Sequence, residues 1–91
     1  MPESASERLS AAGIEHRLHE FLVERTKTEW EPGQDLFASG VVSSLFAMEL
    51  VVFVEKAFDV VVEREDLAMD NFRTISAMTD LVLRLRKAAD A

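Results

Sequence analysis

The chain has 91 residues, 48% of them hydrophobic, which indicates one folded domain rather than a disordered segment. It contains no cysteine, so disulfide bridges and thiolate metal sites are excluded. Its net charge of −7 disfavours nucleic acids and anionic membrane surfaces as ligands and favours basic protein partners. No apolar run approaches the roughly 20 residues that span a bilayer. We therefore expect a cytoplasmic monomer that binds neither nucleic acid nor membrane.

The first predicted helix extends from about Ser10 to Lys27. Its apolar residues recur with the spacing of one helix face: Ile14, Leu18, Phe21 and Leu22. The segment that follows, to about Ser43, is predicted to be a loop because it contains a Pro-Gly pair and a further glycine. Three apolar side chains are expected to anchor this loop to the core: Trp30, Leu36 and Phe37.

A second helix is predicted from Ser44 to Phe58. Its valines, and those at positions 60–62, also have strand propensity, so a β-hairpin is the competing interpretation. We favour the helix because no glycine-rich turn separates the two runs and because the apolar segment is long for a strand.

A short third helix is expected around Glu63 to Met69, where acidic residues in the first turn suit the helix dipole. Thr74 is a good N-cap for the last helix. The apolar stripe of that helix is Ile75, Met78, Val82, Leu85 and Ala89. The predicted fold class is all-α, a small four-helix bundle with three long helices and one short one. Its expected boundaries are a flexible segment 1–9, a single domain 10–88 and a tail 89–91.

Two adjacent serines stand where the long loop meets the second helix. Serine commonly caps a helix, and either Ser43 or Ser44 could do so. An exposed hydroxyl at a helix N-terminus is also a place where a phosphodiester can be held by unpaired N–H groups. Both roles can coexist, with Ser43 as the cap and Ser44 as the modified residue.

A helical wheel of the second helix separates two faces. Ala47, Leu50, Val54 and Phe58 lie on one side, whereas Glu49, Glu55 and Lys56 lie on the other. Three apolar residues fall among these charges: Leu45, Met48 and Val52. They form either a docking surface with Glu49 and Glu55 as its charged surround, or a surface that packs beneath the loop 34–43.

No set of residues resembles a catalytic or metal centre. His16 and His19 share a helix face, but the sequence has no further histidine to complete a bundle metal site. The glycine-rich phosphate-binding motifs are absent. We expect a protein that is not an enzyme and that has no metal site.

Several segments in order resemble the acyl carrier protein family. They are Asp35-Leu36-Phe37, Gly40-Val41-Val42-Ser43-Ser44-Leu45, Glu49-Leu50, Glu55-Lys56-Ala57-Phe58, Glu65-Asp66-Leu67 and Asn71-Phe72-Arg73-Thr74-Ile75. The resemblance implies that Ser44 carries covalent 4′-phosphopantetheine, transferred from coenzyme A by a phosphopantetheinyl transferase. The family usually has aspartate before the modified serine, whereas this chain has Ser43, which can also cap the helix.

The segment 43–56, with residues 70–73, is similar to a narrower group of free-standing carriers. These carriers hold glycerate-derived, methoxymalonyl-type extender units for polyketide antibiotic biosynthesis. This likeness implies four kinds of further partner: an acyl-loading enzyme, dehydrogenases, a methyltransferase and a polyketide synthase acyltransferase. The alternatives are a carrier of another cargo (malonyl, aminoacyl or peptidyl) and a helical interaction module with no prosthetic group.

Overall fold

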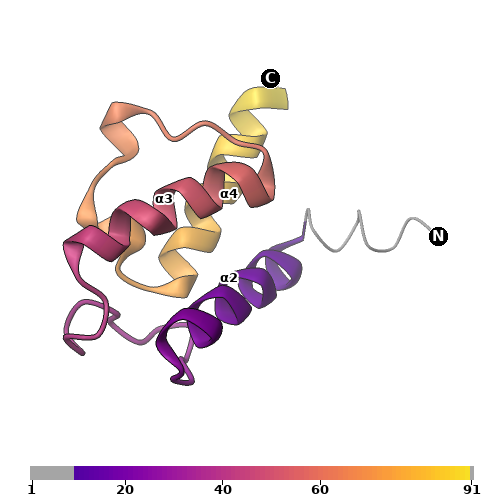
Figure 1. The fold of residues 1–91 in the computed structure, drawn as a ribbon. Helices are drawn as coiled ribbons and strands as arrows, with labels where there is room; N and C mark the ends of the chain where they lie inside the picture. The colour runs from indigo at the N-terminus through magenta and orange to yellow at the C-terminus, as the bar shows by residue number, and fades with distance from the viewer. Residues whose placement is uncertain (1–9, 91) are drawn as a thin grey trace.

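The computed structural model describes residues 10–90, with side chains through residue 87. These residues form three α-helices, α2 (Ala11–Thr26), α3 (Ser44–Phe58) and α4 (Ile75–Asp90), and no strand (Figure 1). Two short 3₁₀ helices, η1 (Arg64–Asp66) and η2 (Met69–Phe72), lie between α3 and α4. The all-helical class predicted from the sequence is confirmed. The segment 1–9 and residue 91 of the expected tail lie outside the described residues.

Helix α2 begins and ends as its sequence predicts. The Ser10 side chain accepts a hydrogen bond from the Gly13 N–H at 3.1 Å, which caps the N-terminus. Lys27 adopts the left-handed conformation that closes the last turn, and its N–H donates to the Val23 carbonyl. The face expected to be apolar is buried through Ile14, Leu18 and Leu22, whereas Phe21 is only partly buried.

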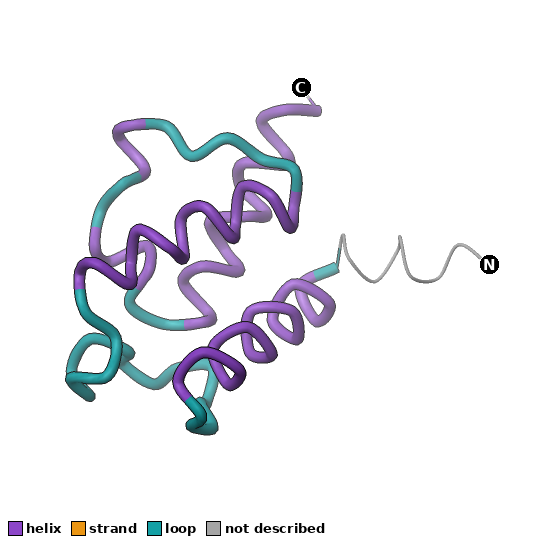
Figure 2. The backbone as a smooth tube through the Cα atoms, in the orientation of Figure 1, coloured by secondary structure: helices purple, strands orange, loops and turns teal. Residues whose placement is uncertain are grey.

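A long loop connects α2 to α3 (Figure 2), and the expected side chains fasten it to the core. Trp30 and Leu36 are buried, and Phe37 is partly buried against the core. The Trp30 indole N–H donates to the Thr26 hydroxyl at 2.9 Å, which satisfies the one polar atom of that ring. The Leu36 N–H donates to the Arg73 carbonyl at 2.8 Å, so the loop is also tied to the start of α4.

Helix α3 has the predicted bounds, and the alternative β-hairpin is wrong. Leu50, Val54 and Phe58 are buried, and Ala47 is partly buried on the same face. The helix ends at Asp59, which takes the left-handed conformation at φ 55°. The valine-rich segment that follows forms neither helix nor strand, and it buries Val60 and Val62.

The short third helix expected at 63–69 is replaced by η1 and η2. The side chains of Glu63 and Asp66 bond reciprocally to backbone N–H groups, which closes a single turn. Ala68 then takes an extended conformation and interrupts the helix. The physical reason is that Leu67 and Met69 are exposed, so this segment has no apolar face to bury along a continuous helix.

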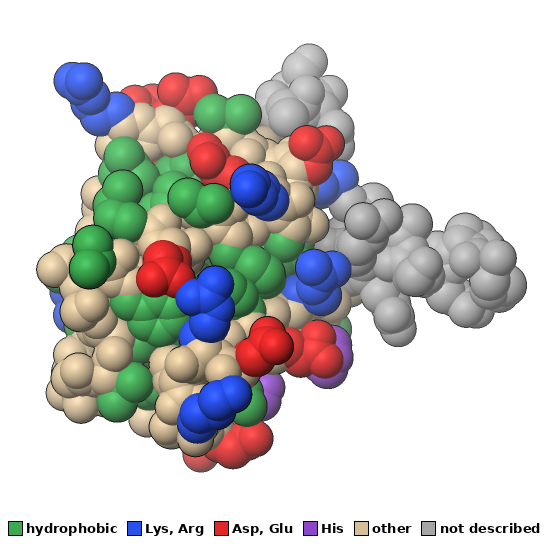
Figure 3. Space-filling view, in the orientation of Figure 1, with side chains coloured by type: hydrophobic (Ala, Val, Ile, Leu, Met, Phe, Trp, Pro, Cys, Tyr) green, Lys and Arg blue, Asp and Glu red, His purple; other side chains and the backbone are tan. Residues whose placement is uncertain are grey.

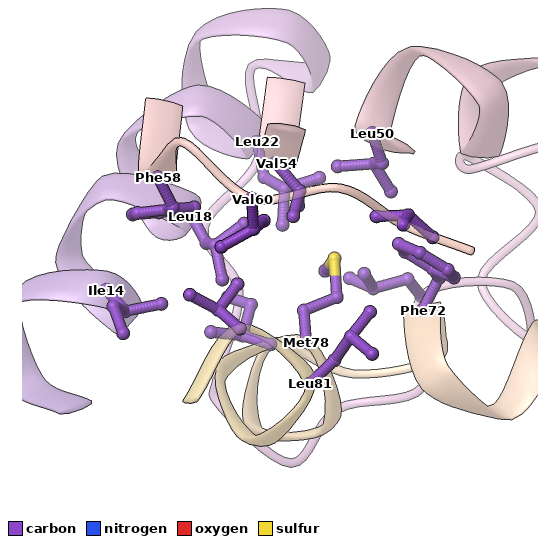
Figure 4. Close-up of a cluster of buried hydrophobic side chains, with 14 of the residues drawn as sticks. Ile14, Leu18, Leu22, Leu50, Val54, Phe58, Val60, Phe72, Met78 and Leu81 are labelled. Atoms are coloured by element: carbon purple, nitrogen blue, oxygen red, sulfur yellow. The ribbon is translucent and has the colours of Figure 1, made fainter. Parts of the chain in front are cut away.

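Helix α4 completes the core. The Thr74 hydroxyl accepts from the Ala77 N–H at 2.9 Å, which confirms the predicted N-cap. The buried side chains of α4 face those of α2 and α3 in one cluster (Figure 4). They are Ile75, Met78, Leu81 and Val82, and the polar Thr79 is buried as well. Leu85 is partly buried, and the side chain of Ala89 lies outside the described part. None of the helices formed by residues 10–90 has the length and hydropathy needed to cross a membrane.

Candidate functional site

The four residues from Gly40 to Ser43 shape the junction between the long loop and α3. Gly40 has φ 81°, in the left-handed region that favours glycine. Val41 is then exposed and Val42 is buried, so the chain is anchored just before the helix. Ser43 follows in an extended conformation, with φ −92° and ψ 170°. This local geometry delivers the two serines to the surface at the N-terminus of α3.

The two serine hydroxyls have different surroundings. The Ser43 hydroxyl accepts from the Phe46 N–H at 3.2 Å and caps α3, as expected for one of the pair. Ser44 is exposed as the first helical residue, and its hydroxyl has no hydrogen-bond partner within residues 10–87. An accessible hydroxyl beside the positive end of a helix dipole fits a phosphodiester, because unpaired N–H groups there favour negative charge.

An apolar row runs along α3 from this junction. Leu45 is 79% exposed, Met48 is 57% exposed and Val52 is 49% exposed, so they do not pack beneath the loop 34–43. Together with Phe21 and Phe53 they line an open groove of about 630 Å³ between α2 and α3. Figure 3 shows hydrophobic side chains over α3 with acidic and basic side chains among them. We call this surface the α2–α3 groove.

The two acidic residues expected to surround the row are both engaged within the chain. Glu49 forms an ion pair with Arg25, whose guanidinium lies 5.0 Å from the centre of the Phe21 ring. Glu55 is partly buried rather than solvated, and its Oε2 accepts from the Val62 N–H at 2.9 Å. Glu55 therefore fastens the segment after α3, which the helical wheel could not show.

Asp35 and Arg73 form a clamp that sequence reasoning missed. Asp35 accepts from the N–H groups of Phe37 and Ala38 at 3.0 Å and from Arg73 Nη1 at 3.3 Å. Arg73 also binds Asp70. The hydrogen bond from the Ala38 N–H is the largest single cause that lowers the pKa of Asp35 below its ordinary value. Desolvation opposes the shift, and Arg73 adds to it through its hydrogen bond and its charge. The clue in the sequence is that an aspartate opening a loop often binds the N–H two residues on.

The two histidines have separate partners. His16 Nε2 lies 3.3 Å from Glu20, and His19 Nε2 lies 3.2 Å from Glu29. Within residues 10–90, no group of three or more potential ligands is arranged to hold a metal ion.

The comparisons with known proteins agree with this geometry. The sequence profile of a family described as "Phosphopantetheine attachment site" matches residues 16–82. The chain is 34% identical over 55 residues to D-alanyl carrier proteins of Streptococcus sanguinis (strain SK36) and Streptococcus gordonii (strain Challis), covering 60% of this chain and 70% of each relative. The D-alanyl carrier protein of Streptococcus mutans serotype c is 33% identical over the same length. No solved structure gives a significant match.

The matched region contains all of α3, both serines and most of the core-forming faces of α2 and α4. The chain therefore belongs to the phosphopantetheine-binding carrier family, whose members are non-catalytic proteins that carry their cargo on covalently attached 4′-phosphopantetheine.

Proposed function

We propose that Ser44 is the residue that carries 4′-phosphopantetheine. The supporting observation is the difference between the two serines at the start of α3. The Ser43 hydroxyl caps the helix, whereas Ser44 is exposed and its hydroxyl has no hydrogen-bond partner within the described part of the chain. A phosphopantetheinyl transferase would join the Ser44 oxygen to the phosphate that bears pantetheine in coenzyme A. The serine proton passes to a base of the transferase, and adenosine 3′,5′-bisphosphate leaves.

The test is intact mass after incubation with coenzyme A and a transferase of broad specificity. Wild type and Ser43→Ala should gain one phosphopantetheine, whereas Ser44→Ala should gain none. Circular dichroism of both variants checks that the fold persists, because an exposed cap contributes only about 1 kcal/mol. Labelling that survives in Ser44→Ala would contradict the assignment.

We propose a glycerate-derived, methoxymalonyl-type acyl group as the cargo, used in polyketide antibiotic biosynthesis in the cytoplasm. The support is the likeness of residues 43–56 and 70–73 to free-standing carriers of such units. The proposed partners follow from that chemistry: a loading enzyme, dehydrogenases, a methyltransferase and a polyketide synthase acyltransferase. The second candidate is an aminoacyl carrier, which the similarity to D-alanyl carrier proteins favours. Intact mass of the protein purified from its native host distinguishes the two cargoes.

We propose that partners dock on the apolar row Leu45, Met48 and Val52, with Glu49 at its edge. Glu55, which the sequence also placed at that edge, is instead bonded to the Val62 N–H. These three side chains are exposed, and the row that they form begins at Leu45, next to Ser44. A partner enzyme that binds the row would therefore receive the phosphopantetheine arm at the partner's active site. Val52→Asp should slow transfer to a partner without changing the unfolding midpoint much, since exposed substitutions usually stay within about 0.5 kcal/mol. Glu49→Gln is the companion variant, and its effect on association rate should shrink as salt rises.

A further inference from the structure

Within residues 10–87, Arg73 is the one residue whose hydrogen bonds join the segment 35–41 to another part of the chain. The Leu36 N–H donates to the Arg73 carbonyl at 2.8 Å, and Arg73 Nη1 donates to Asp35 at 3.3 Å. Arg73 lies between η2 and α4, far from this segment in the sequence. The backbone and the side chain of a single residue therefore hold the loop that leads to Ser44.

The other hydrogen bonds of this loop are internal. Asp35 accepts from two N–H groups of the next three residues. The Ser39 hydroxyl donates to the Leu36 carbonyl at 2.7 Å and accepts from the Val41 N–H at 3.1 Å. Each of these bonds spans only two or three residues. The loop is thus a locally closed unit, and its orientation relative to the core depends on contacts made elsewhere.

Apolar burial and hydrogen bonding hold the loop in different ways. Leu36 and Val42 are buried and keep the loop on the core, but burial of apolar surface is non-directional. Hydrogen bonds have preferred angles, so the bonds to Arg73 fix an orientation as well as a place.

The Arg73 guanidinium is itself held from a second side. Its Nε and Nη2 atoms bind Asp70 of η2 at 3.1 and 3.0 Å. The hydrogen bond to Asp70 and then the one to Asp35 raise the pKa of Arg73 above its ordinary value, although desolvation opposes the shift. The guanidinium thus bridges η2 and the loop in one defined geometry.

We propose that Arg73 is a positioning residue for the modification of Ser44: it fixes the orientation of the loop 35–42, and the loop presents Ser44 to the phosphopantetheinyl transferase. The inference rests on the proposed function, because it takes Ser44 as the attachment residue. Arg73 does not touch the reacting atoms. It acts through the loop, whose last internally bonded residue, Val41, lies three positions before Ser44.

This role has a kinetic signature. Without the Arg73 side chain the apolar anchors still hold the loop, but they permit more than one orientation. A transferase that binds one orientation then meets a smaller competent fraction, which raises the apparent KM for the carrier and leaves kcat at saturation unchanged. The Arg73 and Asp35 side chains are 40% and 38% exposed, and an ion pair of this kind changes a population roughly two- to fivefold.

The experiment measures the kinetics of phosphopantetheine transfer from coenzyme A by a transferase of broad specificity, with intact mass as the readout. Arg73→Gln should raise the KM for the carrier roughly two- to fivefold at unchanged kcat. Arg73→Lys keeps the charge but lacks the planar fork that binds two carboxylates, so its KM should be intermediate. The ratio of the Arg73→Gln and wild-type KM values should approach one as salt rises, because a partly exposed ion pair is screened.

Two control variants separate positioning from a loss of stability. Arg84→Gln is the matched control, because the Arg84 guanidinium binds Asn71 of η2 at 3.3 Å rather than the loop. Val82→Ala leaves a cavity in the core and should lower the unfolding midpoint. Neither variant should change KM when the assay temperature lies below the midpoint of the least stable protein.

Amide hydrogen exchange examines the loop without a transferase. The Leu36 N–H, which bonds the Arg73 carbonyl, should exchange roughly two- to fivefold faster in Arg73→Gln and at the wild-type rate in Arg84→Gln.

An unchanged KM or an unchanged Leu36 exchange rate in Arg73→Gln would overturn the inference and leave the attachment at Ser44 intact. An equal rise of KM in Arg84→Gln or Val82→Ala would do the same, since it would reduce Arg73 to a structural residue. Absence of any mass gain in wild type, or a gain that persists in Ser44→Ala, would overturn the proposed function and this inference together.

Discussion

Ser43 and Ser44 are neighbours with the same side chain, but the helix gives them different environments. The hydroxyl of the N-cap residue Ser43 accepts from an N–H of the first turn, whereas the next residue, Ser44, is exposed and its hydroxyl has no hydrogen-bond partner within residues 10–87. Capping therefore uses one serine and leaves the other accessible. The usual aspartate of the family at position 43 is replaced here by a residue that performs the same capping bond.

The cap and its neighbour should differ in their contribution to stability. Ser43→Ala removes the bond to the Phe46 N–H and should lower the free energy of unfolding by about 1 kcal/mol. Ser44→Ala should change it by less than about 0.5 kcal/mol, because no hydrogen bond within the described residues is lost. Urea unfolding of both variants measures the difference. Equal losses would mean that Ser44 shares the capping role.

The Asp35–Arg73 clamp predicts a pH dependence of stability. The folded-state pKa of Asp35 lies below its ordinary value of 3.8, so folding favours the carboxylate. The stabilisation is complete at pH values above the unfolded pKa and is lost as the pH falls through the folded pKa. Asp35→Asn should therefore lower the thermal midpoint at pH 7, and its difference from wild type should shrink below about pH 4.

Asp80→Asn is the matched control for that measurement, because Asp80 is an exposed carboxylate on α4. Its midpoint should follow that of wild type from pH 7 to pH 3. A constant difference between Asp35→Asn and wild type over the same range would show that the clamp does not depend on the charge of Asp35.

Helix α3 divides its apolar residues between two destinations. Leu50, Val54 and Phe58 fill the core, and Leu45, Met48 and Val52 remain at the surface. The second set adds little to the stability of the fold, because apolar side chains that stay exposed to water contribute no free energy of burial. The first set fills the core, and we propose that the second set binds partners.

The two faces of α3 should respond oppositely to truncation. Phe58 is 3% exposed and meets the Phe53 ring edge-on, so Phe58→Ala should cost about 3–5 kcal/mol. Val52→Ala, on the exposed face, should cost less than about 0.5 kcal/mol. Chemical denaturation measures both values. A loss below about 1 kcal/mol for Phe58→Ala would mean that the orientation of α3 is wrong.

One hydrophobic cluster joins α2, α3, α4 and the long loop. Each helix buries one face and no helix buries enough surface to be stable alone. The loop contributes Trp30, Leu36 and Val42 to the same cluster, so the segment that positions the serines is part of the core. The proposed attachment residue, Ser44, therefore follows directly on a segment that is anchored in the core, although it lies at a loop–helix junction.

A single core predicts a single unfolding transition. Trp30 is the one tryptophan, is 4% exposed, and its indole N–H is bonded to Thr26 at the end of α2. Its fluorescence should change at the same denaturant concentration as the helical circular dichroism signal, as in two-state unfolding. A fluorescence midpoint well below the helical midpoint would show that the loop detaches before the helices unfold.

The sequence by itself determined the approximate bounds of α2 and α3, the N-caps Thr74 and one of the pair Ser43 and Ser44, and most of the core face of each helix, although it missed the buried Leu81 of α4. These features depend on residues three or four positions apart, and local spacing and capping chemistry describe such neighbours completely. The sequence also identified the loop anchors, because a large apolar side chain in a polar loop needs a place to be buried.

Only the tertiary structure decided which polar side chains form ion pairs or hydrogen bonds within the chain. Glu49 pairs with Arg25 from another helix, Glu55 turns to the Val62 N–H, and Asp35 meets Arg73 across the fold. It also decided that residues 64–72 form two separate 3₁₀ turns and that α2 supplies one wall of the groove along α3. Each of these depends on contacts between segments distant in the chain, which the periodicity of a single segment does not encode.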